Sequence, residues 1–287
     1  DYTEDKKFHR VMYRPAFAVQ ARELTTQQSI AQNQIEKLGD SMYKHGSMII
    51  PGEATYDLNH FSIKLTSFTG TLANFADTVI TGGTSGVTAT VKSVAATDGT
   101  DPDTLFVKYS NSGTDNVSAS FTDGETITSS ASTGETAVVS SSHTGCAAFI
   151  DAGTYYINGF FVEVDSQSLI LDKYTNTPDY RVGLTVTENF ITSTDDTTLL
   201  DNATGSSNAN ATGAHRFKIT LTLAKLSLTS TADGSFVETF RLKEGKLQNK
   251  PIDDVRTSIE DTLARRTFDE SWGYVVDAFE LDIRVHL

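Results

Sequence analysis

Cysteine and positive charge are both scarce in this sequence. Cys146 is the only cysteine among 287 residues, so the fold must be held by packing or by assembly with other chains rather than by an internal disulfide framework. The 23 Lys and Arg residues face 37 Asp and Glu residues, which gives a net charge of −14. Because that charge repels phosphate backbones and anionic lipid surfaces, we expect neither a nucleic acid nor a membrane as a partner.

Long apolar runs and targeting signals are missing as well. No stretch approaches the roughly 18 apolar residues that a membrane span needs. No signal peptide is visible, which favours assembly in a cytoplasm. The sequence starts at Asp1 without Met and ends inside a predicted strand, so we expect it to be a piece of a longer polypeptide.

The motifs that usually carry chemistry are missing too. The six histidines are scattered singly, without the His or Cys spacing of a zinc site. There is no G-x-S-x-G elbow, and Cys146 lies among Thr, Gly and Ala at a predicted strand edge, which disfavours a nucleophile. The acidic turn Asp98–Asp103 lacks the spacing and the closing Glu of an EF-hand loop, so a solvated turn is favoured over a Ca²⁺ site. We predict no catalytic residue, no cofactor and no metal.

The sequence is instead rich in Ser, Thr, Gly, Asn and Asp between short apolar runs, with a hydrophobic fraction of 38%. This composition predicts a mainly β fold of the α+β type, with a long N-terminal helix and antiparallel β domains, one of them an inserted small β sandwich or barrel. We expect an N-terminal arm and long helix for docking or oligomerisation over 1–50. The main β domain is expected over 51–72 with 146–252, the inserted β-repeat domain over 73–145, and a helix and strand leading into a continuation of the chain over 253–287.

The predicted N-terminal helix carries a repeating pattern. From about Val19 to Lys44 the chain contains no Pro and only one glycine, Gly39, and it is rich in good helix formers. Six residues recur at alternating spacings of four and three, the a/d pattern of a coiled-coil seam: Leu24, Gln28, Ala31, Ile35, Leu38 and Met42. Since Gln28 and Ala31 are weak seam residues, two interpretations stay open. One is a helix lying on its own β domain, and the other is an intersubunit bundle in which a polar residue fixes the register of a trimer. Gly39-Asp40 marks a weak point, and His45-Gly46 a helix stop.

An internal repeat marks the predicted insertion. The segment from Phe75 to Val91 is echoed by the segment from Phe121 to Val139, each consisting of a strand, a Gly/Ser turn and a second strand. Two copies favour a small β sandwich or barrel over a solenoid, which usually needs at least three repeats.

Further patterns outline the rest of the chain. Asn158-Gly159 predicts a tight hairpin turn, and the alternation over His215–Leu223 predicts a strand with one buried face. The polar stretch Asp195–Gly213 predicts a long surface loop. Val255, Ile259 and Leu263 fall on one helical face, and after Arg266 we expect a return to strand.

Two segments resemble one known family. Val11–Asp40 contains Arg-Pro, then Val-Gln-Ala-Arg-Glu-Leu, then a Gln-rich helix ending at Gly-Asp. It resembles the N-terminal segment of a phage tail-fibre and baseplate family, the domain of unknown function numbered 4815, although Ala16 stands where glycine is usual. Leu263–Ser271 is similar to an Ala-Arg-Arg-Thr-Tyr-Asp-Glu-Ser-Gly motif of the same proteins, with Trp272 interrupting it. The resemblance implies a virion structural protein docked on the tail as a trimer, and it carries over no catalytic residue.

We therefore expect a non-enzymatic structural subunit of a bacteriophage tail, assembled in the bacterial cytoplasm, that contacts copies of itself and other baseplate or tail proteins. The polar arm Asp1–Tyr13 is expected to order on a neighbouring subunit. A receptor-binding or glycan-binding tail module stays open and would expose Tyr155, Tyr156 or Trp272 on one β face, although such aromatics are more often core. A polysaccharide-degrading tailspike also stays open and would line a groove with a carboxylate pair.

Overall fold

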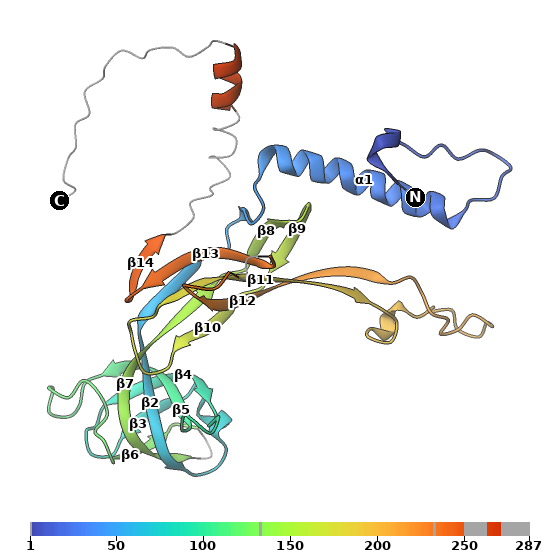
Figure 1. The fold of residues 1–287 in the computed structure, drawn as a ribbon. Helices are drawn as coiled ribbons and strands as arrows, with labels where there is room; N and C mark the ends of the chain where they lie inside the picture. The colour runs from blue at the N-terminus through green and yellow to red at the C-terminus, as the bar shows by residue number, and fades with distance from the viewer. Residues whose placement is uncertain (1, 132–133, 232–233, 250–262, 271–287) are drawn as a thin grey trace. The chain divides into compact units, whose positions relative to one another are not determined.

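The computed structural model describes residues 2–131, 134–231, 234–249 and 263–270. Over these residues the protein is mainly β, with antiparallel sheets and a long N-terminal helix (Figure 1), as the sequence predicts. The chain divides into two compact units. One comprises residues 1–50, 155–161 and 252–287, and the other comprises residues 51–154 and 162–251.

The helix α1 (Ala21–Met42) follows the short 3-10 helix η1 (Glu4–Lys6) and an arm without regular structure. It begins where the Glu23 carboxylate accepts a 2.9 Å hydrogen bond from the backbone N–H of Gln20, which satisfies one of the donors left open at a helix start. The helix runs through Gly39 without a break and ends at Met42, before His45-Gly46. The predicted weak point at Gly39-Asp40 is therefore wrong.

A three-stranded sheet has the order β1-β8-β9, with β1 (Met48–Ile50), β8 (Gly153–Ile157) and β9 (Phe160–Val164). The hairpin between β8 and β9 turns at Asn158-Gly159, whose φ angles of 47° and 83° are both positive. Both central residues of a type I′ turn need positive φ, which Asn and Gly tolerate best. The predicted tight turn is confirmed.

The largest sheet has seven strands in the order β10-β7-β2-β5-β4-β3-β6, and β6 also pairs with β7. Its elements are β2 (Ala54–Phe68), η2 (Leu72–Phe75), β3 (Val79–Gly82), β4 (Thr88–Ala95), β5 (Thr104–Asn111), β6 (Thr126–Ser129), β7 (Thr136–Ile150) and β10 (Gln167–Asp172). The inserted small sandwich or barrel predicted over 73–145 is not shown. Instead, the strands of that range share one sheet with β2 and β10, because each repeat contributes a two-stranded unit that needs further strands to be stable.

The internal repeat is visible as two matching hairpins, β3/β4 and β6/β7. Their first strands pair antiparallel with each other, so that Ile80 lies opposite Ser129 and Gly82 opposite Ile127. The matched Phe75 and Phe121 are both buried. The core of this part consists of side chains from both copies and from β2 and β5: Ile63, Leu65, Leu72, Phe75, Ile80, Val87, Ala89, Val91, Leu105, Val107, Phe121, Ile127, Ala137 and Val139.

A buried carboxylate in the second copy of the internal repeat forms hydrogen bonds with the first copy. Glu125, at the start of the second hairpin, accepts hydrogen bonds from the backbone N–H groups of Thr84 and Ser85 at 3.0 and 2.9 Å, from the Ser85 hydroxyl at 2.8 Å and from the Thr122 N–H at 2.7 Å. Burial alone would raise the pKa of Glu125, but these donors outweigh burial and hold its pKa below the ordinary value. The charged carboxylate therefore stabilises the turn of the first hairpin.

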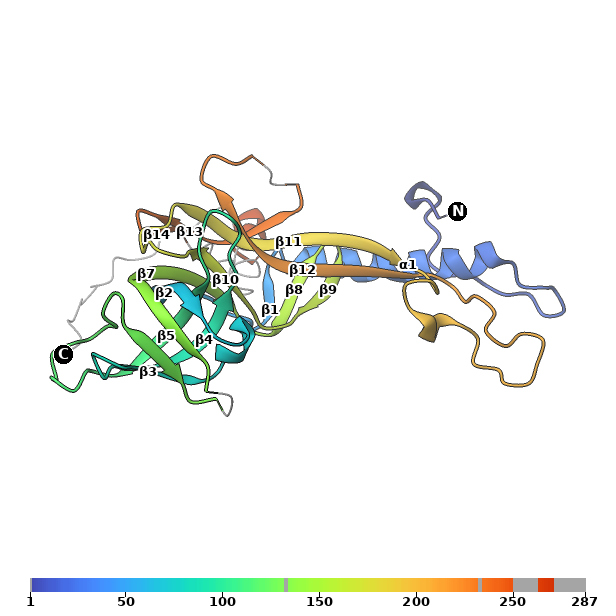
Figure 2. The same ribbon diagram turned by 90° about the horizontal axis from the view of Figure 1, so that it is seen from below.

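The remaining sheet has the order β12-β11-β13-β14, with β11 (Tyr180–Ile191), β12 (Arg216–Ser227), β13 (Phe236–Lys243) and β14 (Lys246–Asn249). The strand predicted over His215–Leu223 is confirmed and continues to Ser227. Along β11, pairing with β13 extends only from Tyr180 to Thr185. The rest of β11 pairs with β12 alone, so these two strands continue as a two-stranded ribbon (Figure 2). The loop at its end contains η3 (Thr197–Leu199) and is mostly exposed.

Residues 263–270 are helical and exposed. The return to strand predicted after Arg266 is therefore wrong for the residues up to Glu270. The strand predicted beyond Glu270 lies outside the described residues, and so do Val255 and Ile259 of the predicted helical face. Within the described part of the chain, no helix has the length and apolar character needed to cross a bilayer.

We predict that Glu125→Ala lowers the free energy of unfolding by about 3 kcal/mol at pH 7, because several buried donors lose a charged acceptor. Since the folded pKa of Glu125 is lowered, its contribution is present above the ordinary pKa of 4.5 and is lost as the pH falls below it. Because glutamine has no carboxylate to protonate, the Glu125→Gln variant should lose less stability than the original chain between pH 4.5 and pH 3. Urea unfolding at pH 7, 4.5 and 3 measures these effects.

Asp123→Ala is the matched control, because this neighbouring carboxylate is exposed. It should change the stability by less than about 0.5 kcal/mol. Equal effects of the two alanine substitutions would contradict a role for the buried carboxylate.

Candidate protein-binding interface

One face of α1 packs on the β8/β9 hairpin of its own unit. The Tyr156 hydroxyl of β8 lies 3.0 Å from the Glu36 carbonyl oxygen and 2.9 Å from the Asp40 carboxylate, and the Gln32 amide donates to the Gly159 carbonyl at 2.9 Å. Burial, followed by the nearby Asp40 carboxylate, raises the pKa of Tyr156 to about 12, so its hydroxyl stays protonated and donates to the helix. The hairpin therefore fixes the orientation of α1.

Gly39 makes this packing possible. A Cβ atom at position 39 would lie 2.5 Å from the Tyr156 ring, a distance that no real contact tolerates. Sequence reasoning interpreted Gly39 as a weak point and missed this role. The available signal was a lone glycine inside a helix otherwise free of glycine, which often marks a close approach.

An aromatic cluster completes the packed face. The Tyr43 ring lies 5.8 Å from the rings of both Tyr156 and Phe161, measured between centroids, and Tyr156 lies 5.3 Å from Phe161. Tyr155 and Tyr156 are 3% and 1% exposed. The interpretation of these two tyrosines as core residues is confirmed, and Trp272 lies outside the described residues.

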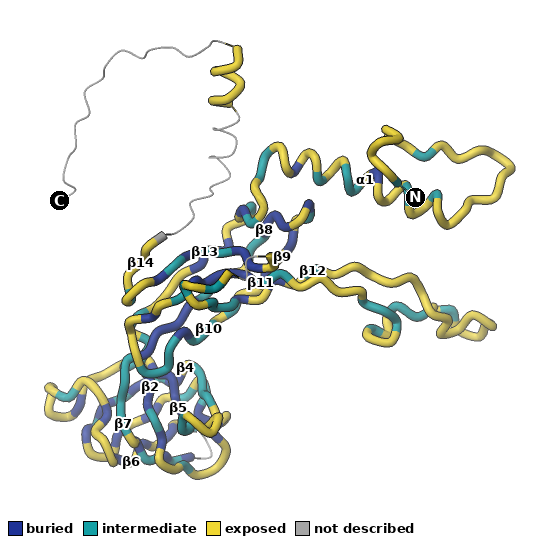
Figure 3. The backbone as a smooth tube through the Cα atoms, viewed as in Figure 1, coloured by how far each residue is buried: buried dark blue, intermediate teal, exposed yellow. Residues whose placement is uncertain are grey.

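Much of α1 is exposed (Figure 3), and so are five of the six residues of the predicted seam. Leu24, Ile35 and Leu38 are 52%, 47% and 60% exposed, Gln28 and Ala31 are exposed, and Met42 is half-buried. Spacings of three and four bring these six side chains to one side of the helix. The structure thus combines the packing of the helix on its own chain with an uncovered apolar stripe, and the binding of another chain to that stripe stays a prediction.

The N-terminal arm contacts α1 of its own chain. Tyr13 donates a 2.6 Å hydrogen bond to Gln27, and the Glu4 carboxylate lies 2.6 Å from the Asn33 amide and 3.1 Å from the Lys37 ammonium. Large apolar side chains of the arm nevertheless remain exposed, and these are Phe8, Met12, Phe17 and Val19. The expected ordering of the arm on a neighbouring subunit stays a prediction.

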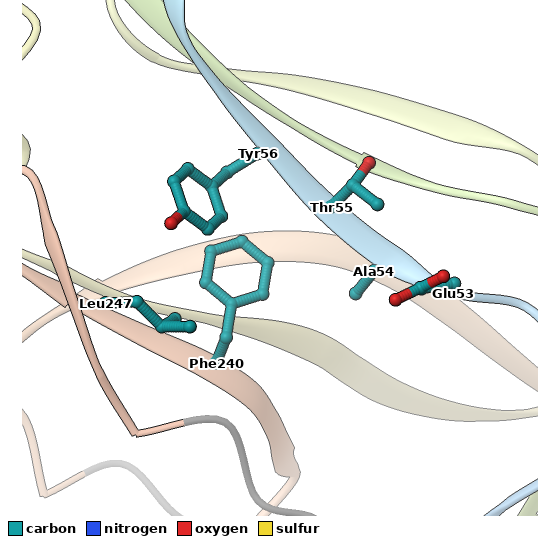
Figure 4. Close-up of a pocket in the computed structure, with 6 residues that line it drawn as sticks. All are labelled: Glu53, Ala54, Thr55, Tyr56, Phe240 and Leu247. Atoms are coloured by element: carbon teal, nitrogen blue, oxygen red, sulfur yellow. The ribbon is translucent and has the colours of Figure 1, made fainter. Parts of the chain in front are cut away.

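A separate hollow opens in the β unit, which sequence reasoning did not find because its walls come from distant parts of the chain. Its volume is about 270 Å³, and it is lined by Ala54, Thr55 and Tyr56 of β2, by Glu53 just before that strand, by Phe240 of β13 and by Leu247 of β14 (Figure 4). The Tyr56 and Phe240 rings face each other with centroids 5.6 Å apart. Tyr56 and Leu247 are 37% and 42% exposed, so the hollow opens to solvent. We call the cavity that these six residues line the hollow.

The groups with possible chemistry are engaged in structural contacts. Cys146 is fully buried, and burial raises its pKa to about 11, which keeps the thiol protonated and unreactive at neutral pH. Asp98 and Asp101 of the acidic turn lie 3.1 and 2.9 Å from the Lys173 ammonium. Among the residues that the structure describes, no group of three or more His, Cys, Asp and Glu side chains is placed to hold a metal ion.

Ser141 and His143 are hydrogen-bonded at 2.8 Å, a pair that sequence reasoning did not consider. They are neighbours on one face of β7, and the His143 ring packs 5.3 Å from the Tyr174 ring. A hydroxyl nucleophile also needs a base oriented by a third group. The contacts of this pair instead suit a packed strand surface.

We predict that Gly39→Ala destabilises the contact between α1 and the hairpin by about 1 to 3 kcal/mol, because the added methyl group forces the Tyr156 ring to move. If Gly39 were only a weak point of the helix, alanine would instead stabilise the helix by up to about 1 kcal/mol. Hydrogen exchange of the α1 amides distinguishes the two signs. Ser29→Ala, at an exposed position of the same helix, is the control and should leave protection unchanged or slightly increase it.

Comparison with known proteins gives one match. The family model described as a domain of unknown function, DUF4815, matches residues 109–286. No curated protein and no solved structure matches the chain. The resemblance seen in Leu263–Ser271 lies inside the matched range, whereas Val11–Asp40 lies outside it, so the matched domain is not the N-terminal one. Because the match covers more than half of the sequence, the chain belongs to the DUF4815 family.

Proposed function

We propose that this chain is a non-enzymatic assembly protein, a baseplate or tail-fibre attachment subunit in the tail of a bacteriophage virion, and that it forms homotrimers through the seam of α1. The observation that carries the proposal is that α1 is fixed on its own chain and still leaves apolar side chains exposed. Tyr156 and Gly39 hold the helix on the chain's own hairpin, while Leu24, Ile35 and Leu38 remain about half exposed to solvent.

The first 50 residues concentrate exposed apolar side chains. Ten large hydrophobic residues of this segment are exposed, namely Phe8, Met12, Tyr13, Phe17, Val19, Leu24, Ile35, Leu38, Met48 and Ile50. Single exposed apolar residues need no explanation, but a concentration of them marks a surface that binds another protein. This segment therefore favours assembly over an isolated monomer.

The seam alone provides a moderate driving force. Complete burial of a Leu or Ile side chain contributes about 1.5 to 3 kcal/mol, and Leu24, Ile35 and Leu38 are each about half exposed in the single chain. Burying the three side chains thus contributes roughly 2 to 5 kcal/mol per chain, whereas association costs about 4 to 15 kcal/mol in lost freedom. A stable trimer therefore needs further contacts beside the seam.

The location in a phage tail is supported by the resemblance of Val11–Asp40 and Leu263–Ser271 to tail-fibre and baseplate proteins. The net charge of −14 suits protein partners better than nucleic acid or anionic membranes. The alternative of a glycan-binding module receives no support from Tyr155 and Tyr156, because both are buried.

We predict that replacing Ile35 and Leu38 with Asp abolishes the oligomer and leaves the β signal in circular dichroism intact. The reason is that two charges would have to be buried in an apolar seam, while in the single chain both positions face solvent. Sedimentation velocity of the full chain measures the change.

The matched control replaces Thr25 and Ser29 with Asp. Both residues are exposed on α1 but lie outside the seam, so this variant adds the same charge to the same helix and should keep the oligomer. Survival of the oligomer in the Ile35/Leu38 variant would contradict the seam, and loss in both variants would point to charge alone.

A further inference from the structure

The arm of unit 1 builds a small aromatic projection. Arg14, Pro15, Ala16 and Phe17 form a turn in which the Phe17 N–H reaches the Arg14 carbonyl at 3.3 Å, and the Arg14 guanidinium lies 4.2 Å from the centre of the Phe17 ring. Ala16 has a φ of 63°, a conformation that costs energy for any residue except glycine. Phe17 is nevertheless 63% exposed. We call Arg14 and Phe17 the knob.

The knob lies in a basic stretch of the sequence. Between Asp5 and Glu23 there are basic residues and no acidic one: Lys6, Lys7, Arg10, Arg14 and Arg22. The whole chain carries a net charge of −14, so the remainder of the chain is more acidic still. An exposed basic segment on an acidic protein is electrostatically complementary to other copies of that protein.

The hollow of the β unit has the complementary chemistry. Its lining includes the apolar and aromatic residues Ala54, Tyr56, Phe240 and Leu247 and the carboxylate residue Glu53 (Figure 4). An apolar cavity of about 150 Å³ is enough to hold benzene, so the volume of about 270 Å³ has room for a phenyl ring. A ring that enters between Tyr56 and Leu247 would cover apolar surface that is exposed on both sides.

We propose that the hollow is a binding site for the knob of a second copy of this chain, with Phe17 in the hollow and Arg14 beside Glu53. The contact is heterologous, because each copy offers one knob and one hollow on different surfaces. Such contacts satisfy every copy when they close into a ring. The proposal goes beyond the α1 seam and does not require it, although a closed ring of three would add the contacts that a trimer needs.

Disulfide trapping between two full-length chains tests the contact. One chain carries Phe17→Cys and the other, made longer by a tag, carries Leu247→Cys. Cys146 can stay, because it is buried and its pKa is raised to about 11. Mixing followed by mild oxidation should give the mixed-size covalent dimer in at least about tenfold higher yield than a pairing of Phe17→Cys with Val117→Cys, since Val117 is 82% exposed and lies outside the hollow.

Two results would overturn the proposal. The first is an equal yield with Leu247→Cys and with Val117→Cys, which would mean random collision. The second concerns a chain that carries both Phe17→Cys and Leu247→Cys. If its disulfide forms only within one chain, at a yield that does not depend on dilution, the hollow is occupied by the knob of the same chain.

Charge exchange tests the specific pairing of Arg14 with Glu53. Arg14→Glu in the knob chain, or Glu53→Arg in the hollow chain, should each lower the trapping yield several-fold. Combining the two substituted chains should restore it, because the charges again have opposite sign. Circular dichroism of each variant confirms folding, and an unchanged yield in all combinations would contradict the pairing.

The trapping experiment also separates this proposal from the α1 seam. The mixed dimer should still form when Ile35 and Leu38 are replaced by Asp in both chains at micromolar concentration. Trapping that disappears in this background would make the knob contact a consequence of the seam and overturn its independence.

Discussion

The close approach of the Tyr156 ring to Gly39 is the constraint on which the interpretation of this protein depends. It sets the rotation of α1 about its own axis, because only one position of the helix lacks a Cβ atom and the hydroxyl of Tyr156 must reach Glu36 and Asp40 at the same time. With α1 fixed in this way, Leu24, Ile35 and Leu38 remain about half exposed to solvent. A contact inside the chain thus determines which surface is offered outside it.

The protein exposes two kinds of surface that differ in physical character. The seam of α1 is a regular apolar stripe, suited to symmetric packing against equivalent helices. The knob and the hollow are unlike each other, and the knob contains a basic residue whereas the hollow contains an acidic one, which suits contacts between different surfaces of neighbouring copies. Neither surface needs a catalytic group, and both place apolar side chains in solvent in the isolated chain. Assembly explains why both surfaces expose apolar side chains, which would not contribute to the stability of an isolated chain.

Periodic local patterns were predictable from the sequence, and long-range contacts were not. The helix over 21–42, the turn at Asn158-Gly159 and the alternation in β12 follow from the spacing of a few neighbouring residues. The role of Gly39 depends on Tyr156, which is far away in the sequence, and the hollow unites β2 with β13 and β14. The repeat was visible in the sequence, but its sharing of one sheet with β2 and β10 depends on pairings between distant strands. Ala16 stands where glycine is usual in the family that the segment resembles, and its positive φ shapes the knob.

The central claim, assembly through copies of the same chain, is tested most directly by the mass of the purified full chain in solution. Light scattering over a dilution series measures that mass without any label. We predict a species near three times the chain mass of 31.1 kDa that persists from high to low micromolar concentration. A monomer at every concentration would contradict assembly through self-contacts and would require a different protein to cover the α1 seam.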